Sequence, residues 1–130
     1  MKYIKTEKAP KAVGPYSQAI VSNGLIFCSG QIGLDPKTNE LTEGIENQTH
    51  QVLKNLAVVL KSGGSSLEKV VKTTVYLADI KDYVKMNEVY GQYFSDHKPA
   101  RAAFAVAHLP KDALIEIEVL AEVRDQGLEI

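Results

Sequence analysis

The chain has 130 residues, 45% of them hydrophobic and 24% charged, which are the proportions of one ordinary folded domain. Its formal net charge of −1 provides no general attraction to nucleic acid or to acidic membranes. No apolar run approaches the roughly 20 residues that span a membrane, and the charged N-terminus lacks the apolar segment of a secretion signal. The single cysteine, Cys28, excludes an internal disulfide. We therefore expect one domain over residues 1–130, located in the cytoplasm.

Three strands are expected before the first helix. Residues 2–5 have the pattern of a short edge strand, and a second strand is expected over residues 16–21, after a loop rich in Pro and Gly. Residues 22–24 predict a hairpin turn, because Asn-Gly tolerates positive φ. The strand over residues 25–28 is uniformly apolar, which predicts burial on both faces. It ends in Ser-Gly-Gln at residues 29–31, which is either a place where backbone N–H groups approach a ligand or a bulge or turn.

Two amphipathic helices are expected in the middle of the chain. Apolar residues recur at three- and four-residue spacing over residues 43–62, between a polar loop and a Gly-Gly pair that ends the helix. Residues 70–78 alternate as a strand does. Asp79 is the expected N-cap of the second helix, residues 81–95, whose apolar stripe is rich in tyrosine. Asn87 falls on this stripe, where a polar side chain needs a hydrogen-bond partner.

The last two strands carry the residues that most resemble a binding site. Arg101 stands at the start of a strand of small residues, which leaves a guanidinium room to bind a carboxylate through two hydrogen bonds. Over residues 115–119 the side chains alternate between faces, so Glu116 and Glu118 share one face and lie roughly 6–7 Å apart. A plainer interpretation competes with this one, in which Arg101 forms a salt bridge and both glutamates face solvent.

The expected element order is β-β-β-α-β-α-β-β, an α+β domain with two helices on one face of a sheet. The last strand has one apolar face, expected under the helices, and one face that carries its three glutamates and a leucine. Two helices cover only one sheet face, so the other face must meet water or another subunit. Proximity along the chain favours direct pairing of the last two strands. The three histidines are scattered and have no spacing typical of zinc ligands, so no metal site is expected.

Four groups of residues resemble, in order, the motifs of the RidA family of reactive-intermediate (enamine/imine) deaminases. They are GPYSQ at residues 14–18, SGQ at 29–31, VKTTV at 71–75, and PAR, LP and IEIE between Pro99 and Glu118. The resemblance implies the chorismate-mutase-like fold, a mostly antiparallel six-stranded sheet with two helices on one face. It also implies a homotrimer with pockets between subunits. In that fold the last strand inserts between earlier strands, contrary to the direct pairing that the residues favour.

The resemblance further implies hydrolysis of 2-imino acids or their enamine tautomers, such as 2-iminopropanoate and 2-iminobutanoate, to 2-oxo acids and ammonia. Arg101 would bind the substrate carboxylate, and Glu116 would activate the attacking water. Five further residues are implied to bind substrate: Tyr16, Ser29, Gly30, Asn87 and Ala103. No cofactor is required, because the imine carbon is already electrophilic. Burial and Glu118 would raise the pKa of Glu116 while Arg101 would lower it, and the sequence leaves the net direction open.

Two other functions compete with deamination. A regulatory or chaperone-like protein would use the same pocket without turnover. A ribonuclease is disfavoured, because the chain is nearly neutral and has no basic stripe. One departure from the family bears on the chemistry. Many relatives carry a cysteine where this chain has Ala103, and Cys28 lies in an apolar strand that makes it a core residue. We therefore expect direct attack by water with no thiol intermediate.

Overall fold

The computed structural model describes residues 1–123. The prediction of one domain over residues 1–130 extends into residues 124–130, which lie outside the described part of the chain.

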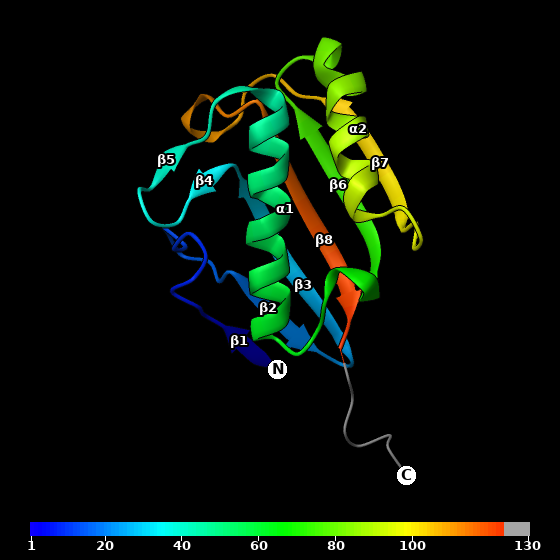
Figure 1. Ribbon diagram of the computed structural model, residues 1–130. Coiled ribbons are helices and arrows are strands. Elements are labelled where there is room, and N and C mark those ends of the chain that lie inside the picture. Colours follow the sequence, from blue (N-terminus) through cyan, green and yellow to red (C-terminus); the bar gives the residue numbers. More distant parts are fainter. Residues whose placement is uncertain (124–130) are drawn as a thin grey trace.

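A six-stranded sheet is the centre of the fold, with strand order β1-β2-β3-β8-β6-β7 (Figure 1). All neighbouring strands are antiparallel except β6 and β7, which are parallel. Their bounds are β1 Lys2–Ile4, β2 Ala19–Ser22, β3 Leu25–Ile32, β6 Val70–Leu77, β7 Ala100–Ala105 and β8 Ile115–Glu122. The expected α+β fold with a mostly antiparallel six-stranded sheet is confirmed.

The direct pairing of β7 with β8 that the residues favoured is wrong. Strand β8 lies between β3 and β6, and the resemblance implied this insertion correctly. Strand β7 instead pairs in parallel with β6. The helix α2 follows β6 in the chain and returns it to the edge of the sheet at which β6 begins, so that β7 runs in the same direction as β6. A central position suits β8, since Ile115, Ile117 and Ala121 have no exposed surface and two neighbouring strands satisfy its backbone.

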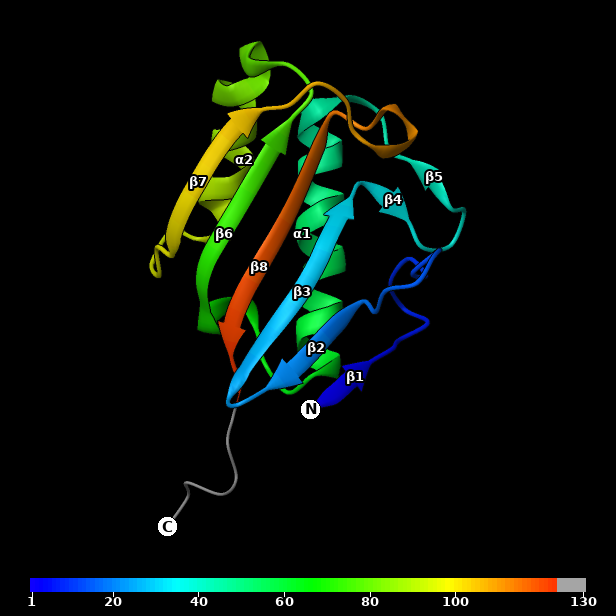
Figure 2. The same cartoon turned by 180° about the vertical axis from the view of Figure 1, so that it is seen from behind.

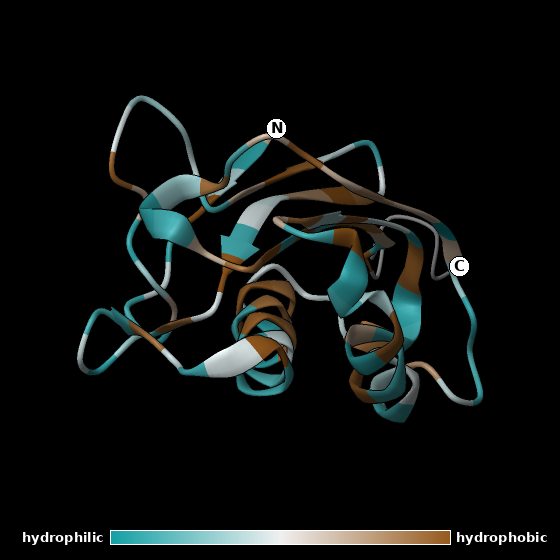
Figure 3. Cartoon of the chain, turned by 90° about the horizontal axis from the view of Figure 1, so that it is seen from above, coloured by the Kyte–Doolittle hydropathy of each residue, from teal (hydrophilic) through white to brown (hydrophobic). Residues whose placement is uncertain are grey.

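Both helices pack on the same face of the sheet (Figures 1 and 3). Helix α1 spans Gly44–Ser62, close to the predicted range, and Gly64 follows it with a φ of +86°, a conformation that favours glycine. Helix α2 spans Tyr83–Tyr93 and is shorter than predicted. Its first turn is a separate 3₁₀ helix, Ile80–Asp82, and Asp79 caps that turn by accepting a hydrogen bond from the backbone N–H of Lys81 at 3.0 Å.

The hydrophobic core lies between this sheet face and the helices. It includes β8 residues Ile115, Ile117 and Val119, and helix residues such as Leu56 and Met86, none of them more than 4% exposed. Burial of each such side chain contributes about 1.5–3 kcal/mol to folding. The predicted split of β8 into a buried apolar face and a polar face is confirmed.

No helix of residues 1–123 covers the opposite sheet face (Figure 2). Phe27 and Phe104 are exposed there, at 48% and 44%. The prediction that residues 25–28 are buried on both faces is therefore wrong. Ile26 points to the helices and is fully buried, whereas Phe27 points the other way.

Smaller differences lie in the loops. Strand β2 begins at Ala19 and not at residue 16, because the chain turns at Gly14, whose carbonyl accepts from the Tyr16 N–H at 2.9 Å. The loop before α1 contains a two-stranded ribbon, β4 Leu34–Asp35 and β5 Glu40–Leu41. Further 3₁₀ helices span Leu67–Lys69 and Pro110–Asp112. Within residues 1–123, no helix has both the length and the apolar character needed to cross a membrane.

Candidate active site

The carboxylate of Glu116 on β8 lies directly against Gly30 on β3. A Cβ added at Gly30 would clash with Glu116 Oε2 and would lie only 2.8 Å from Cδ. The β3–β8 register shifts between Cys28, which pairs with Val119, and Gln31, which pairs with Ile117, so Ser29 and Gly30 form an irregularity in the ladder close to Glu116. Residues 29–31 thus contain the irregularity that was one of the two alternatives predicted for them, and at this irregularity the Glu116 carboxylate approaches the Gly30 backbone closely. Gly30 leaves space that any other residue would fill.

The environment of Glu116 raises its pKa above the ordinary value for a glutamate. Burial of the carboxylate is the larger cause, because burial disfavours the charged form, and the negative charge of Glu118 is the second. Glu118 itself is exposed and accepts a hydrogen bond from Tyr76 Oη at 2.8 Å. A glutamate whose pKa lies nearer to neutral pH is better suited to take up and return a proton.

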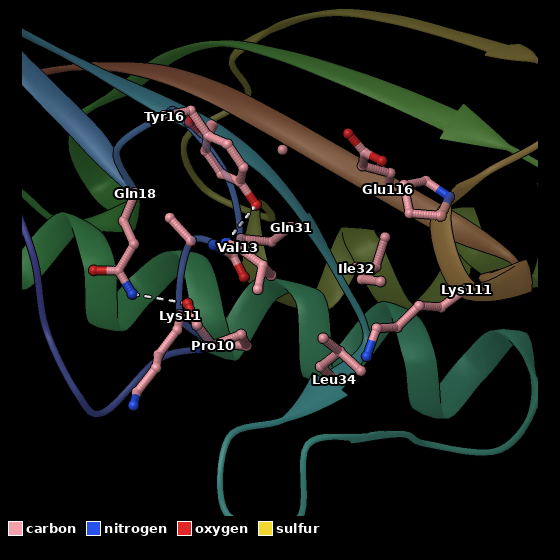
Figure 4. A pocket seen from close by; sticks show the side chains of 14 residues that line it. Pro10, Lys11, Val13, Tyr16, Gln18, Gln31, Ile32, Leu34, Lys111 and Glu116 are labelled. Atoms are coloured by element: carbon pink, nitrogen blue, oxygen red, sulfur yellow. Dashed lines mark hydrogen bonds between the residues drawn. The ribbon is translucent and has the colours of Figure 1, made fainter.

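Glu116 lines a cavity of about 400 Å³ together with Tyr16, Ser29 and Gly30. Figure 4 shows Tyr16 on one side of this cavity and Glu116 on the other. Glu116 supplies the one carboxylate among the described residues that line it, and Lys111 lines it as well. The fold therefore brings four of the predicted site residues together from three separate segments of the chain.

Ser29 supports this cavity from within the chain. Its hydroxyl donates to the Ser17 carbonyl at 2.6 Å, and its backbone N–H donates to the Gln18 carbonyl at 3.0 Å. Both bonds hold the segment that follows Tyr16 against β3. Within one chain, Ser29 thus uses both of its hydrogen-bond donors to position its neighbours. Its hydroxyl oxygen can still accept a hydrogen bond from a ligand.

Arg101 lies on β7 and contacts α2. One terminal nitrogen of its guanidinium donates to Asn87 Oδ1 at 2.7 Å and the other to Tyr83 Oη at 2.6 Å. The guanidinium carbon also lies 4.7 Å from the ring centroid of Tyr90. Arg101 is thus the partner that the stripe position of Asn87 required. Within residues 1–123, Arg101 forms no salt bridge, so its charge is not neutralised there by a carboxylate.

One chain does not bring these two groups together. Arg101 pairs in register with the buried Thr73 and shares the helix-covered face of the sheet, and Ala103, two residues on, packs against the core. Glu116 alternates with buried Ile115 and Ile117 and so points to the uncovered face. Strands β6 and β8 separate β7 from β3. Arg101, Asn87 and Ala103 therefore form one group, and the Glu116 cavity forms another.

No group of three His, Cys, Asp or Glu side chains within residues 1–123 is arranged to hold a metal ion. Cys28 is buried, and burial raises its pKa to about 12, so its thiol stays protonated and unreactive at neutral pH.

The family model described as endoribonuclease L-PSP matches residues 6–123. A RutC family protein of Pyrococcus horikoshii is 56% identical over 91% of this chain and 94% of its own length. The human protein named 2-iminobutanoate/2-iminopropanoate deaminase is 51% identical over 91% of this chain and 87% of its own length. The crystal structure of RidA from an Antarctic Psychrobacter species matches with a TM-score of 0.92 at 44% identity, covering 95% of this chain and 100% of that one. The chain belongs to the RidA (endoribonuclease L-PSP) family.

Membership of the RidA family confirms the resemblance that the motifs indicated. The motifs did not reveal Tyr83 and Tyr90 as contacts of Arg101, because a tyrosine stripe on a helix is also what a core face looks like. Lys111 was overlooked as well. It lies in the Leu-Pro segment before β8, and both it and Asp112 have positive φ, 56° and 58°, which residues other than glycine rarely adopt. No sequence signal marked that backbone conformation.

Proposed function

We propose that this RidA-family chain hydrolyses reactive 2-imino acids, such as 2-iminopropanoate and 2-iminobutanoate, to 2-oxo acids and ammonia. The observation that carries the proposal is the half-buried Glu116 carboxylate, which lies in a cavity against Gly30 and has a raised pKa. The printed name of the human relative, which is 51% identical, states this activity for that protein.

In the proposed reaction, Glu116 takes a proton from a water molecule while the water oxygen bonds to the imine carbon. The electron pair of the C=N bond moves to nitrogen. Glu116 then returns its proton to that nitrogen, which gives a tetrahedral intermediate with one hydroxyl and one amino group. In a second transfer Glu116 takes the hydroxyl proton and passes it to the amino group. The oxygen electron pair forms the carbonyl of the 2-oxo acid as the C–N bond breaks, and the nitrogen leaves with the bonding pair as ammonia. Arg101 binds the substrate carboxylate through two hydrogen bonds and so holds the imine carbon in place. Each step uses groups of the chain, water and substrate.

We further propose that the complete site forms between two copies of the chain in a homotrimer. Arg101 and Glu116 point to opposite faces of one sheet, so a substrate that needs both must meet them from different subunits. The uncovered face, with Phe27 and Phe104 exposed, supplies apolar surface for such an assembly. The substrate-binding roles of Tyr16, Ser29, Gly30, Asn87 and Ala103 are part of this proposal.

A coupled assay tests the activity. A PLP-dependent dehydratase generates the imine, and release of 2-oxo acid is followed with and without the chain. We expect faster release with the wild type, and Glu116→Gln should lower the acceleration by about 10²-fold or more while keeping ligand binding, because glutamine cannot accept the proton.

A wild type that binds a 2-oxo acid yet does not accelerate its release would instead support a ligand-binding regulatory role. A glutamine variant as active as the wild type would assign the base to another residue. Cleavage of RNA by the wild type but not by Glu116→Gln would favour the ribonuclease alternative.

A further inference from the structure

The guanidinium of Arg101 is held only by uncharged groups within residues 1–123. Asn87 Oδ1 and Tyr83 Oη each accept one of its hydrogen bonds, and its carbon lies over the rings of Tyr83 and Tyr90, at 5.6 Å and 4.7 Å from their centroids. Carboxylates in these places would neutralise the charge and compete with an anionic ligand. Amide and phenol groups orient the guanidinium and leave its positive charge available.

Tyr90 is itself fixed by a second, fully buried contact. Its hydroxyl shares a hydrogen bond of 2.7 Å with Thr73 Oγ1, and Thr73 has no exposed surface. Its ring packs against Phe94, with centroids 4.8 Å apart. Thr73 on β6 is also the register partner of Arg101 on β7. Thr73 on β6 thus fixes Tyr90 on α2, and the guanidinium of Arg101, on the neighbouring strand β7, lies over the Tyr90 ring.

The phenol of Tyr90 stays neutral in this arrangement. Burial raises its pKa, and this effect outweighs the opposing effects of the Thr73 hydrogen bond and the Arg101 charge. A phenolate would neutralise the charge of Arg101. A neutral phenol instead presents the electron-rich face of its ring, which attracts a cation. The raised pKa of Tyr90 is therefore consistent with the contact between its ring and the Arg101 guanidinium.

We propose that Tyr90, fixed by Thr73, is a positioning residue that orients the Arg101 guanidinium for carboxylate binding without neutralising its charge. This inference rests on the proposed function, in which Arg101 binds the substrate carboxylate. It adds two residues, on α2 and β6, that do not touch substrate and act only through Arg101.

The test compares Tyr90→Phe, Thr73→Val and the double variant with the wild type. Tyr90→Phe keeps the aromatic ring and removes only the hydroxyl that fixes it. The matched control is Tyr93→Phe, because Tyr93 lies on the same helix and its hydroxyl bonds His50 Nδ1 at 2.7 Å, away from Arg101. The probe is 2-oxobutanoate, a stable carboxylate, measured by calorimetry beside 2-oxobutanamide, which lacks the negative charge.

We expect each single variant to bind 2-oxobutanoate roughly threefold to tenfold more weakly, the range that the loss of one hydrogen bond produces. The double variant should be no worse than either single variant, since both remove the same contact. KM for the imine should rise by a similar factor, while the pH profile set by Glu116 stays unchanged. Tyr93→Phe and binding of the amide should not change.

Unchanged binding of 2-oxobutanoate by folded Tyr90→Phe and Thr73→Val would overturn the inference, even if both proteins melt at lower temperature. In that case deamination by the wild type would still support the proposed function. If instead the wild type binds 2-oxobutanoate no better than Arg101→Ala does, Arg101 has no carboxylate role, and the inference fails together with the role that the proposed function gives to Arg101. Weak binding by the Tyr90 and Thr73 variants without any deamination by the wild type would support the inference and reject the reaction.

Discussion

At the residue scale, Glu116 has one strong neighbouring charge that can be removed without touching the carboxylate itself. Glu118 raises the pKa of Glu116 through its negative charge, and it is exposed, with Tyr76 as its hydrogen-bond partner. Burial of Glu116 is the larger cause and does not depend on Glu118. The two contributions are therefore separable by one substitution.

We expect Glu118→Gln to move the acid limb of the rate profile to lower pH. The proposed base works only when deprotonated, so the rate falls as pH falls through the pKa of Glu116, and a lower pKa keeps the base active in more acidic solution. Burial persists, so the pKa should not return fully to its usual value. A subunit that brings Arg101 near would lower the pKa in both proteins. Coinciding acid limbs for wild type and variant would show that Glu118 does not act on the base.

The same raised pKa affects stability with a definite sign. The folded protein binds the Glu116 proton more tightly than the unfolded chain does, so stability decreases as pH rises from the unfolded pKa through the folded one. Ionised Glu116 thus destabilises the fold at neutral pH, as expected for a group with the catalytic role that we propose for it.

At the scale of elements, the site depends on the contact between β3 and β8. Gly30→Ala should keep the fold of the sheet but displace the Glu116 carboxylate, because the added Cβ occupies its place. We expect deamination to fall by about 10²-fold, the effect of a displacement near 1 Å at a reacting group. Gly24→Ala is the matched control for backbone effects, since nothing lies within 4 Å of its added Cβ, although its own φ of +80° adds strain. Equal loss of activity in both variants would attribute the effect to the backbone and not to Glu116.

The sequence predicted elements well where a periodic apolar pattern meets a single buried face. Helix α1 and the alternation in β8 belong to this class. The prediction of strand neighbours was wrong, because these depend on pairing between segments far apart in the sequence. No local pattern indicates that β8 pairs with β3 and β6 and not with β7. Phe27 shows the same limit. An apolar run in a strand does not reveal that one sheet face lacks helices.

The candidate site, like the fold, was predictable from the sequence only in part. Motifs predicted residues such as Glu116 and Gly30, which the fold then brings into contact. They could not predict that Arg101 would point to the other face of the sheet, since this follows from the register of β7 on β6. The support of Arg101 by Tyr90 was also hidden, because it depends on a contact between two elements that the sequence does not place beside each other.

At the scale of the whole molecule, the proposed site needs two copies of the chain, because Arg101 and Glu116 point to opposite faces of one sheet. In a cyclic trimer, each site would take Arg101 from one copy and Glu116 from the next. Arg101→Ala and Glu116→Gln should each be inactive alone. A mixed trimer of the two, however, contains one interface at which the intact arginine meets the intact glutamate.

We therefore expect mixed trimers to recover roughly one third of wild-type activity, one site of three in a closed ring. The two variants carry different affinity tags, are produced in the same cells, and are purified through both tags so that only mixed oligomers remain. Light scattering gives the mass of the purified species, and oligomers of each variant alone serve as the inactive controls. Doubly tagged trimers without activity would place Arg101 and Glu116 of a working site in the same chain. A monomer mass for the wild type at micromolar concentration would remove the interface on which the shared site depends.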